Sequence, residues 1–173
     1  MTEKLPNSTA CFVCGHSNPA GLRARFYLEG DRVVTRFTPA PAQMGYKGIT
    51  HGGIIAALLD ETMGWAPAVA NRRFCVTVEI NVQYLRPIPI GKEVLVSAWV
   101  TDGHRRIWEA EGEIGDADGT LYAKGKGRFL PVSDEQTAEV VSYLNFDEGC
   151  VGPERICRSC SQNLESASNP STR

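Results

Sequence analysis

The segment from Ile54 to Ala70 limits the fold more than any other part of this sequence. Almost every residue in it is apolar, and it is too long for a β-strand. It therefore predicts a helix that is apolar on most of its sides, and such a helix has to be buried. Gly52 and Gly53 precede it, and Pro67 is expected to kink or fray its last turn.

The rest of the chain mostly shows the two-residue periodicity of β-strands. An alternating pair of segments around Gly30 and Asp31 predicts an antiparallel hairpin, and residues 76–84 predict a long strand with one apolar and one polar face. The segments expected to be strands are 22–28, 32–37, 76–84, 93–101, 105–114 and 120–130. A second, short helix is expected from Ser133, where the sequence fits a capping box.

These elements predict an α+β fold in which one antiparallel sheet wraps around one long central helix. A single helix cannot cover both faces of the sheet, so an exposed face or edge strand favours a dimer or a larger assembly. We expect an N-terminal segment over residues 1–21, the main domain over 22–131, and a helix with a polar, disordered tail over 132–173.

Charge and hydropathy exclude several classes of function. The formal net charge of −2 gives no electrostatic basis for binding nucleic acid. No run approaches the roughly 18 apolar residues that span a bilayer. Residues 1–6 contain no apolar signal core, which favours a cytoplasmic location.

The turn before the long helix is a candidate binding site for a carbonyl oxygen. Glycines at a helix start let backbone N–H groups approach a ligand without a Cβ in the way. The amides of the first turn lack intrahelical partners and lie at the positive end of the helix dipole. Gly52 and Gly53 could therefore hold a developing oxyanion. The same two glycines would also fit a plain tight turn that enters a helix.

Two carboxylates lie within the apolar helix. Asp60 and Glu61 are about 100° apart around the helix axis, so they face different surroundings. One is expected to face a cleft as a general base or nucleophile, and the other to pair, for example with Arg72 or Arg86. The alternative is a carboxylate at a subunit interface with a purely structural partner.

At this point the sequence resembles a known family. The stretch from His51 to Asp60 is similar to the HGG-x(6)-D pattern of hotdog-fold thioesterases of the phenylacetate-pathway (PaaI-like) type, in the 4-hydroxybenzoyl-CoA thioesterase superfamily. Residues 76–87 and 14–22 also resemble that family, and the resemblance covers roughly residues 11–131. It implies a hotdog fold and the hydrolysis of acyl-CoA thioesters.

The resemblance also implies roles for individual residues. Asp60 matches the catalytic aspartate, which acts as a general base toward water or as a nucleophile, and Gly52, with Gly53 beside it, matches the amide that polarises the thioester carbonyl. Thr77 falls where relatives often place a hydroxyl residue that helps to position water. In the family, the aspartate and the amide come from different subunits of a homodimer, which we expect to assemble further into a tetramer.

Other residues near this motif have supporting or uncertain roles. His51 either orients the turn or makes a structural hydrogen bond, and Glu61 is a second candidate for the base. Relatives commonly have Asn six residues before the histidine, where this sequence has Gly45, and Gln43 is the nearest amide side chain that could substitute.

Cations that could bind the CoA phosphates occur at a turn and along the last strand. In the family, CoA runs past the strands that correspond to these positions. The candidates are Arg105, Arg106, Lys124 and Lys126. For each of them a solvated surface position is an equally good reading.

Four of the six cysteines form two C-x-x-C pairs. Cys11, Cys14, Cys157 and Cys160 supply the four thiolates that a structural zinc needs, although incidental thiols are the simpler reading and no cofactor is otherwise expected. Two other functions remain open: a hotdog hydratase or dehydratase, and a non-catalytic acyl-CoA-binding module.

Overall fold

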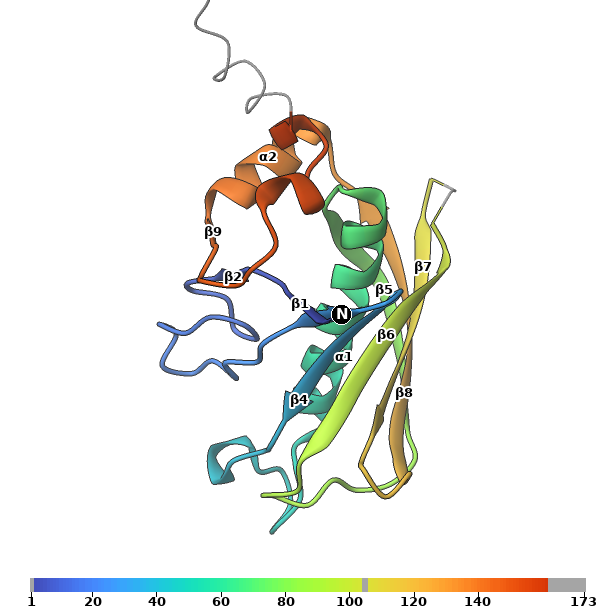
Figure 1. Ribbon diagram of the computed structural model, residues 1–173. Coiled ribbons are helices and arrows are strands. Elements are labelled where there is room, and N and C mark those ends of the chain that lie inside the picture. The colour runs from blue at the N-terminus through green and yellow to red at the C-terminus, as the bar shows by residue number, and fades with distance from the viewer. Residues whose placement is uncertain (1, 104–105, 162–173) are drawn as a thin grey trace, which may run out of the picture.

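A computed structural model describes residues 2–103 and 106–161 (Figure 1). Within these ranges seven strands form one antiparallel sheet in the order β1-β3-β4-β6-β7-β8-β5. The strands of this sheet are β1 (Thr2–Lys4), β3 (Tyr27–Glu29), β4 (Arg32–Phe37), β5 (Cys75–Tyr84), β6 (Val94–Asp102), β7 (Trp108–Gly115) and β8 (Leu121–Pro131). The helices are α1 (Gly52–Asn71) and α2 (Asp134–Ser142), with short 3₁₀ turns at Pro41–Gln43, Pro153–Arg155 and Ser159–Ser161.

The sheet wraps around α1, as the sequence predicts (Figure 1). The helix lies close against the sheet because glycines face it from the neighbouring strands β7 and β8. A Cβ on Gly125 would lie 3.0 Å from Met63 Cε, and one on Gly112 would lie 3.1 Å from Met63 Cγ. Met63 and Leu59 are completely buried in this contact. No helix in the described ranges is both long and apolar enough to cross a membrane.

The bounds of α1 differ from the prediction at both ends. Gly52 and Gly53 are its first two residues rather than a turn that precedes it. At the other end, the helix continues through Pro67 to Asn71 instead of fraying, and Arg72 caps it with a left-handed backbone (φ 52°). Near this end of the helix, the Asn71 side chain donates to the Pro67 carbonyl at 3.0 Å.

The hairpin strand predicted from residue 22 begins only at Tyr27. Arg23 has a left-handed backbone (φ 58°), which interrupts any regular ladder at that point. The alternation nevertheless buries Leu22, Ala24 and Phe26 against the N-terminal segment. Backbone hydrogen bonds such as Leu22 N to Phe12 O replace the sheet ladder there.

The prediction of one apolar and one polar face on β5 is wrong. A β-bulge shifts the register between Thr77 and Glu79, which changes the face on which later side chains lie. Val76 and Val78 are consequently 52% and 54% exposed, although they belong to the apolar set. β5 is also an edge strand of the sheet, so its outer hydrogen-bonding groups have no neighbouring strand.

The segments outside the predicted domain pack against it. β1 adds a strand beside β3, and β2 (Asn7–Ser8) pairs with β9 (Leu144–Asn145) to join the two ends of the chain. Figure 1 shows α2 and the C-terminal turns near the end of α1 that leads into β5. The capping box at Ser133 is confirmed. Residues 162–173, predicted to be disordered, lie outside the described residues.

Candidate active site

The turn at the start of α1 leaves one amide available. His51 is the N-cap, and its Nδ1 accepts a hydrogen bond from the Gly53 amide at 2.9 Å. The Gly52 amide has no intrahelical acceptor because it is the first residue of the helix, and no acceptor in the described residues meets it. The Tyr84 hydroxyl of β5 donates to the Gly52 carbonyl at 3.0 Å and fixes the orientation of this peptide.

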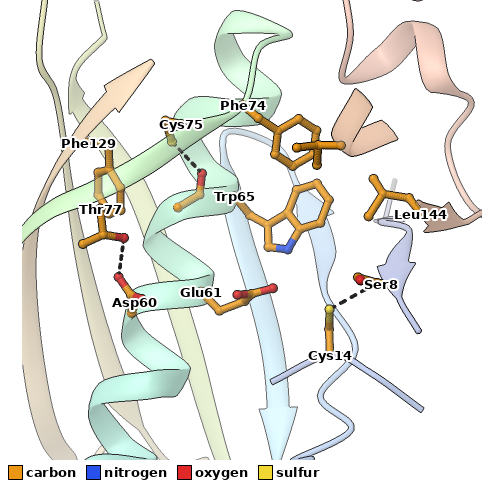
Figure 2. A pocket seen from close by; sticks show the side chains of 12 residues that line it. Ser8, Cys14, Asp60, Glu61, Trp65, Phe74, Cys75, Thr77, Phe129 and Leu144 are labelled. Carbon is orange, nitrogen blue, oxygen red and sulfur yellow. Dashed lines mark hydrogen bonds between the residues drawn. The ribbon is translucent and has the colours of Figure 1, made fainter. Parts of the chain in front are cut away.

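Asp60 lies about two turns further along α1 and faces β5. The Thr77 hydroxyl donates to Asp60 Oδ1 at 2.8 Å, which holds the carboxylate in one orientation (Figure 2). The bulge directly after Thr77 lets this residue face the helix while Ile80 and Val82, further along the strand, also pack against the core. Of the predicted site residues, Asp60 and Thr77 are therefore brought into direct contact.

A cavity of about 200 Å³ opens beside this pair (Figure 2). Asp60, Glu61 and Thr77 contribute its polar groups, and aromatic side chains form much of the remaining wall. Its other lining residues are Ser8, Cys14, Gly64, Trp65, Phe74, Cys75, Phe129, Val140 and Leu144. No local sequence pattern predicts most of this wall, because its residues come from separate elements and meet only through the tertiary fold.

Glu61 points to a different side of α1 from Asp60, toward the N-terminal segment (Figure 2). Its Oε1 lies 3.7 Å from Cys11 Sγ. Neither Arg72 nor Arg86, the partners proposed from the sequence, takes this place: their guanidinium groups donate to the carbonyls of Cys157 and Leu121. Burial raises the pKa of Glu61 to about 7, and the charge of Cys11 adds to the effect.

The surroundings of the Cys11 thiol favour its ionised form. Hydrogen bonding from Cys14 lowers the pKa of Cys11 to about 5, against the opposing effect of burial, while the same contact raises the pKa of Cys14. The amides of Val13 and Cys14 donate to Cys11 Sγ at 3.3 and 3.4 Å.

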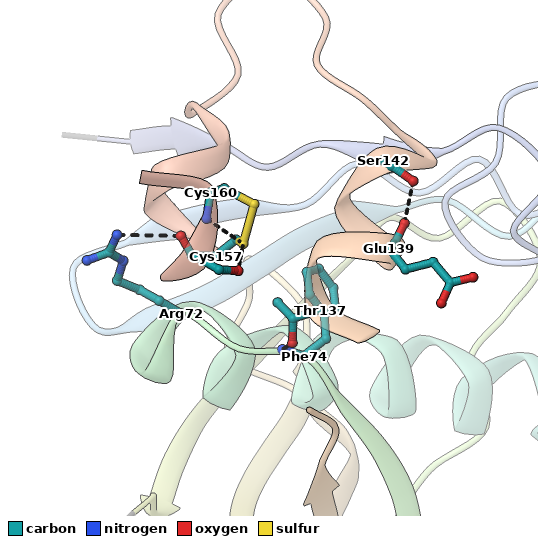
Figure 3. Close-up of a disulfide and its surroundings, with 8 residues drawn as sticks. Arg72, Phe74, Thr137, Glu139, Ser142, Cys157 and Cys160 are labelled. Atoms are coloured by element: carbon teal, nitrogen blue, oxygen red, sulfur yellow. Dashed lines mark hydrogen bonds between the residues drawn. A yellow bond between two sulfur atoms is a disulfide. The ribbon is translucent and has the colours of Figure 1, made fainter. Parts of the chain in front are cut away.

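The zinc site with four thiolates, which the sequence left open as a less favoured alternative to incidental thiols, is not formed by the described residues. Cys157 and Cys160 are joined to each other in a disulfide beside Arg72 (Figure 3). Cys11 and Cys14 instead cluster with Glu61. The two pairs therefore occupy separate places in the described structure.

The amide side chain that was expected to replace the missing asparagine is engaged elsewhere. Gln43 Oε1 accepts a hydrogen bond from the Ala40 amide at 2.6 Å and caps its own turn. Gly45 packs directly against His51, where an added Cβ would lie 3.0 Å from His51 Cα. This close approach explains why a larger side chain at position 45 would displace the turn.

The candidate CoA-binding cations lie away from Asp60 in this chain. Lys124 and Lys126 are exposed on the outer face of β8, since the alternate residue Gly125 faces the helix. Lys126 pairs with Glu111 at 2.8 Å. Arg106 is exposed between β6 and β7, and Arg105 lies outside the described residues.

Gly52 and Asp60 are separated along one helix. Eight residues at a rise of 1.5 Å each put them about 12 Å apart along the axis. This distance is too long for one carbonyl group to contact both the Gly52 amide and the Asp60 carboxylate. Within one chain the two therefore belong to different parts of the surface.

Comparison with known proteins identifies relatives of this architecture. A family model described as the thioesterase superfamily matches residues 47–123. Acyl-coenzyme A thioesterase THEM4 of Xenopus laevis is 40% identical over 76 residues, which make up 43% of this chain and 34% of that protein. A Saccharolobus solfataricus protein provisionally named an esterase is 33% identical over 101 residues, 58% of this chain and 71% of that protein.

Among solved structures, a protein described as a thioesterase superfamily member superposes with a TM-score of 0.66 and 25% identity. The match covers 70% of this chain and 60% of that chain. This chain spans only 34%, 46% and 58% of the lengths of the first three curated relatives, all of them acyl-coenzyme A thioesterases of vertebrates.

Proposed function

We propose that this chain, which belongs to the thioesterase superfamily, hydrolyses acyl-CoA thioesters to the free acid and CoA. The predicted family and hotdog fold are confirmed by these similarities. The observation that carries the proposal is the Asp60 carboxylate, held at 2.8 Å by Thr77 on the wall of a largely apolar cavity. Curated relatives named as acyl-coenzyme A thioesterases support the substrate class.

Asp60 is the group proposed to act on the thioester. As a general base it takes a proton from water, whose oxygen attacks the carbonyl carbon; as a nucleophile it attacks that carbon itself, and water then hydrolyses the resulting anhydride. In both routes the C–S bond breaks and CoA leaves as its thiol. The Gly52 amide stabilises the negative charge that develops on the carbonyl oxygen.

We propose that the site is completed by a second copy of the chain. The Gly52 amide and Asp60 are about 12 Å apart along one helix, so the amide of one subunit would serve the aspartate of the other. β5 supports this arrangement because it is a sheet edge with exposed Val76 and Val78, and exposed apolar edges favour pairing. A homodimer, assembled further into a tetramer, is the proposed state, and a monomer is inactive.

The cavity is the proposed site of the acyl group. Trp65, Phe74 and Phe129 give it an aromatic lining. Its volume of about 200 Å³ is below the roughly 300–1,000 Å³ of typical ligand pockets, which favours a medium-chain or aromatic acyl group. Arg106, Lys124 and Lys126 are the described cations proposed to meet the CoA phosphates, and the reaction as proposed uses no cofactor.

Release of free thiol from a panel of acyl-CoAs tests the proposal. Wild-type protein should release CoA, and Asp60→Asn should abolish turnover while the Tm and the oligomeric state stay unchanged. Asp118→Asn, at an exposed turn, makes the same chemical change away from the cavity and should keep full activity. Turnover retained in Asp60→Asn would refute the assignment of the base.

The same assay separates the alternative functions. A hydratase or dehydratase would change the absorbance of an enoyl-CoA or hydroxyacyl-CoA without releasing thiol. An acyl-CoA-binding module would bind the ligand and leave it intact. Either result from wild-type protein would replace the proposal of hydrolysis.

A further inference from the structure

The N-terminal C-x-x-C pair lies next to the candidate active site instead of joining the C-terminal pair. One donor atom from each of Cys11, Cys14 and Glu61 lies within 4.8 Å of the others. The three residues come from two segments 50 positions apart in the sequence. From this cluster we propose that Cys11, Cys14 and Glu61 bind one Zn²⁺ ion.

The donor atoms have spacings close to those of a tetrahedral zinc site. Zinc bonds of about 2.3 Å to sulfur and 2.0–2.2 Å to oxygen place tetrahedral ligand atoms about 3.5–3.8 Å apart. Cys11 Sγ and Glu61 Oε1 are 3.7 Å apart. Cys14 Sγ lies within 4.8 Å of each of these two atoms.

Backbone amides surround the two thiols and donate hydrogen bonds to their sulfur atoms. Two amides donate to Cys11 Sγ, and the Ser8 amide donates to Cys14 Sγ at 3.4 Å. Such donors stabilise thiolates, which are the form that binds metal. Gly15 follows directly, and a Cβ on it would lie 2.3 Å from the Cys11 carbonyl oxygen, so the tight turn of the pair requires glycine.

Glu61 gives an independent reason to expect a cation here. It is largely shielded from solvent beside apolar side chains, and in the described residues no Lys, Arg or His forms an ion pair with it. A carboxylate in such surroundings is stabilised either by taking up a proton or by a compensating cation. Two thiolates and one carboxylate form a soft donor set that suits Zn²⁺ better than Mg²⁺ or Ca²⁺.

The fourth coordination position is open to the cavity. Cys14 and Glu61 both line the cavity, so water could reach the ion from that side. The ion would fasten the N-terminal segment to α1 at the residue next to Asp60. It would also hold the Glu61 carboxylate as a ligand, which leaves Asp60 as the carboxylate available for the reaction.

Metal content tests the proposal without any substrate, so its outcome is independent of the proposed hydrolysis. Full-length protein purified under reducing conditions with Zn²⁺ present should contain about one zinc per chain by mass spectrometry of the metal. Cys11→Ser and Glu61→Gln should each reduce this to less than about 0.2 per chain. Cys150→Ser and Cys160→Ser remove thiols outside the cluster and should keep about one.

A second measurement uses the wild-type chain alone, in case the variants fold poorly. Zn²⁺ should protect Cys11 and Cys14 from alkylation by iodoacetamide, and a chelator should remove that protection. Replacement by Co²⁺ should give a thiolate-to-metal absorption band in the near ultraviolet. A reduced protein without bound zinc, equal alkylation with and without Zn²⁺, or zinc retained by both Cys11→Ser and Glu61→Gln would overturn the proposal.

Discussion

Replacing Thr77 by valine should slow thioester hydrolysis without unfolding the protein. The Thr77 hydroxyl donates to Asp60 Oδ1 at 2.8 Å, and it is the described side chain that orients this carboxylate. Valine has nearly the same shape and suits a β-strand, so the backbone of β5 should not change. The substitution therefore removes a donor and little else.

The expected magnitude follows from the strength of that hydrogen bond. A hydrogen bond to a charged group contributes about 1.5–3 kcal/mol, and each 1.36 kcal/mol of lost transition-state stabilisation costs about tenfold in rate. Thr77 is exposed in the single chain, which favours the lower half of the range because water can partly replace the hydroxyl. We expect kcat/KM to fall by about 10- to 50-fold.

Thr77→Ser is the matched variant, because it keeps the hydroxyl and loses only a methyl group. It should keep kcat/KM within about threefold of the wild type, whereas Thr77→Val should not. Initial rates of thiol release give kcat and KM for each variant, and thermal unfolding checks that the Tm is unchanged. The reasoning fails if Thr77→Val retains wild-type kcat/KM, or if serine and valine reduce it equally.

Three further predictions concern the cavity, the edge strand and the turn between β7 and β8. Gly64→Ala should raise the free energy of unfolding by about 0.5–1 kcal/mol, because alanine favours a helix interior, and its Cβ would meet only Phe129, at 3.7 Å. It should also lower kcat/KM for the bulkiest acyl-CoAs by narrowing the cavity. Val78→Lys should convert the dimer to monomers and abolish turnover, as measured by light scattering and thiol release. Burial disfavours ionised Asp116, but hydrogen bonds from Lys92, Thr120 and Tyr122 outweigh it and hold the pKa of Asp116 well below its usual value. Because folding lowers the pKa of Asp116, its ionised form stabilises the protein fully above the unfolded pKa of about 4. This stabilisation is lost as the pH falls toward the folded pKa, so the free energy of unfolding of Asp116→Asn should depend less steeply on pH in that range.

Each of these predictions has a contradicting result. An unchanged acyl-chain profile in Gly64→Ala would show that the cavity does not hold the acyl group. Val78→Lys would contradict the interface if it stayed dimeric, and Tyr143→Lys, exposed directly after α2, is its control. For Asp116→Asn, acid unfolding as steep as in the wild type would contradict the proposed contribution of Asp116 ionisation to stability.

The long helix and the strands could be predicted because their signals are local. The mostly apolar run between Gly52 and Asn71 is too long for a strand and predicts a buried helix, and the capping box at Ser133 depends on side chains three residues apart. Asp60 could be selected for the same reason, since a carboxylate inside an apolar helix stands out in the sequence. In the folded chain it indeed borders the cavity.

Features that depend on tertiary contacts could not be predicted. The β-bulge after Thr77 reverses which residues of β5 face the helix, and the apolar alternation of the sequence gives no sign of it. The left-handed backbone at Arg23 shortens the first hairpin strand, although its side-chain pattern continues. One zinc site shared by the two C-x-x-C pairs stayed open as an alternative, because spacing alone cannot show which distant cysteines meet.

The adjacent carboxylates show how one helix can serve two purposes in this fold. Because neighbouring side chains project about 100° apart, Asp60 faces Thr77 on the edge strand while Glu61 faces Cys11 on the N-terminal segment. A second free carboxylate in the same cavity would repel the negative charge that develops during thioester hydrolysis. If a cation held by Cys11 and Cys14 binds Glu61, the N-terminal segment keeps this carboxylate away from the reacting carbonyl as well as covering α1. Loss of the cation should then reduce turnover even though Asp60, Thr77 and the Gly52 turn remain in place.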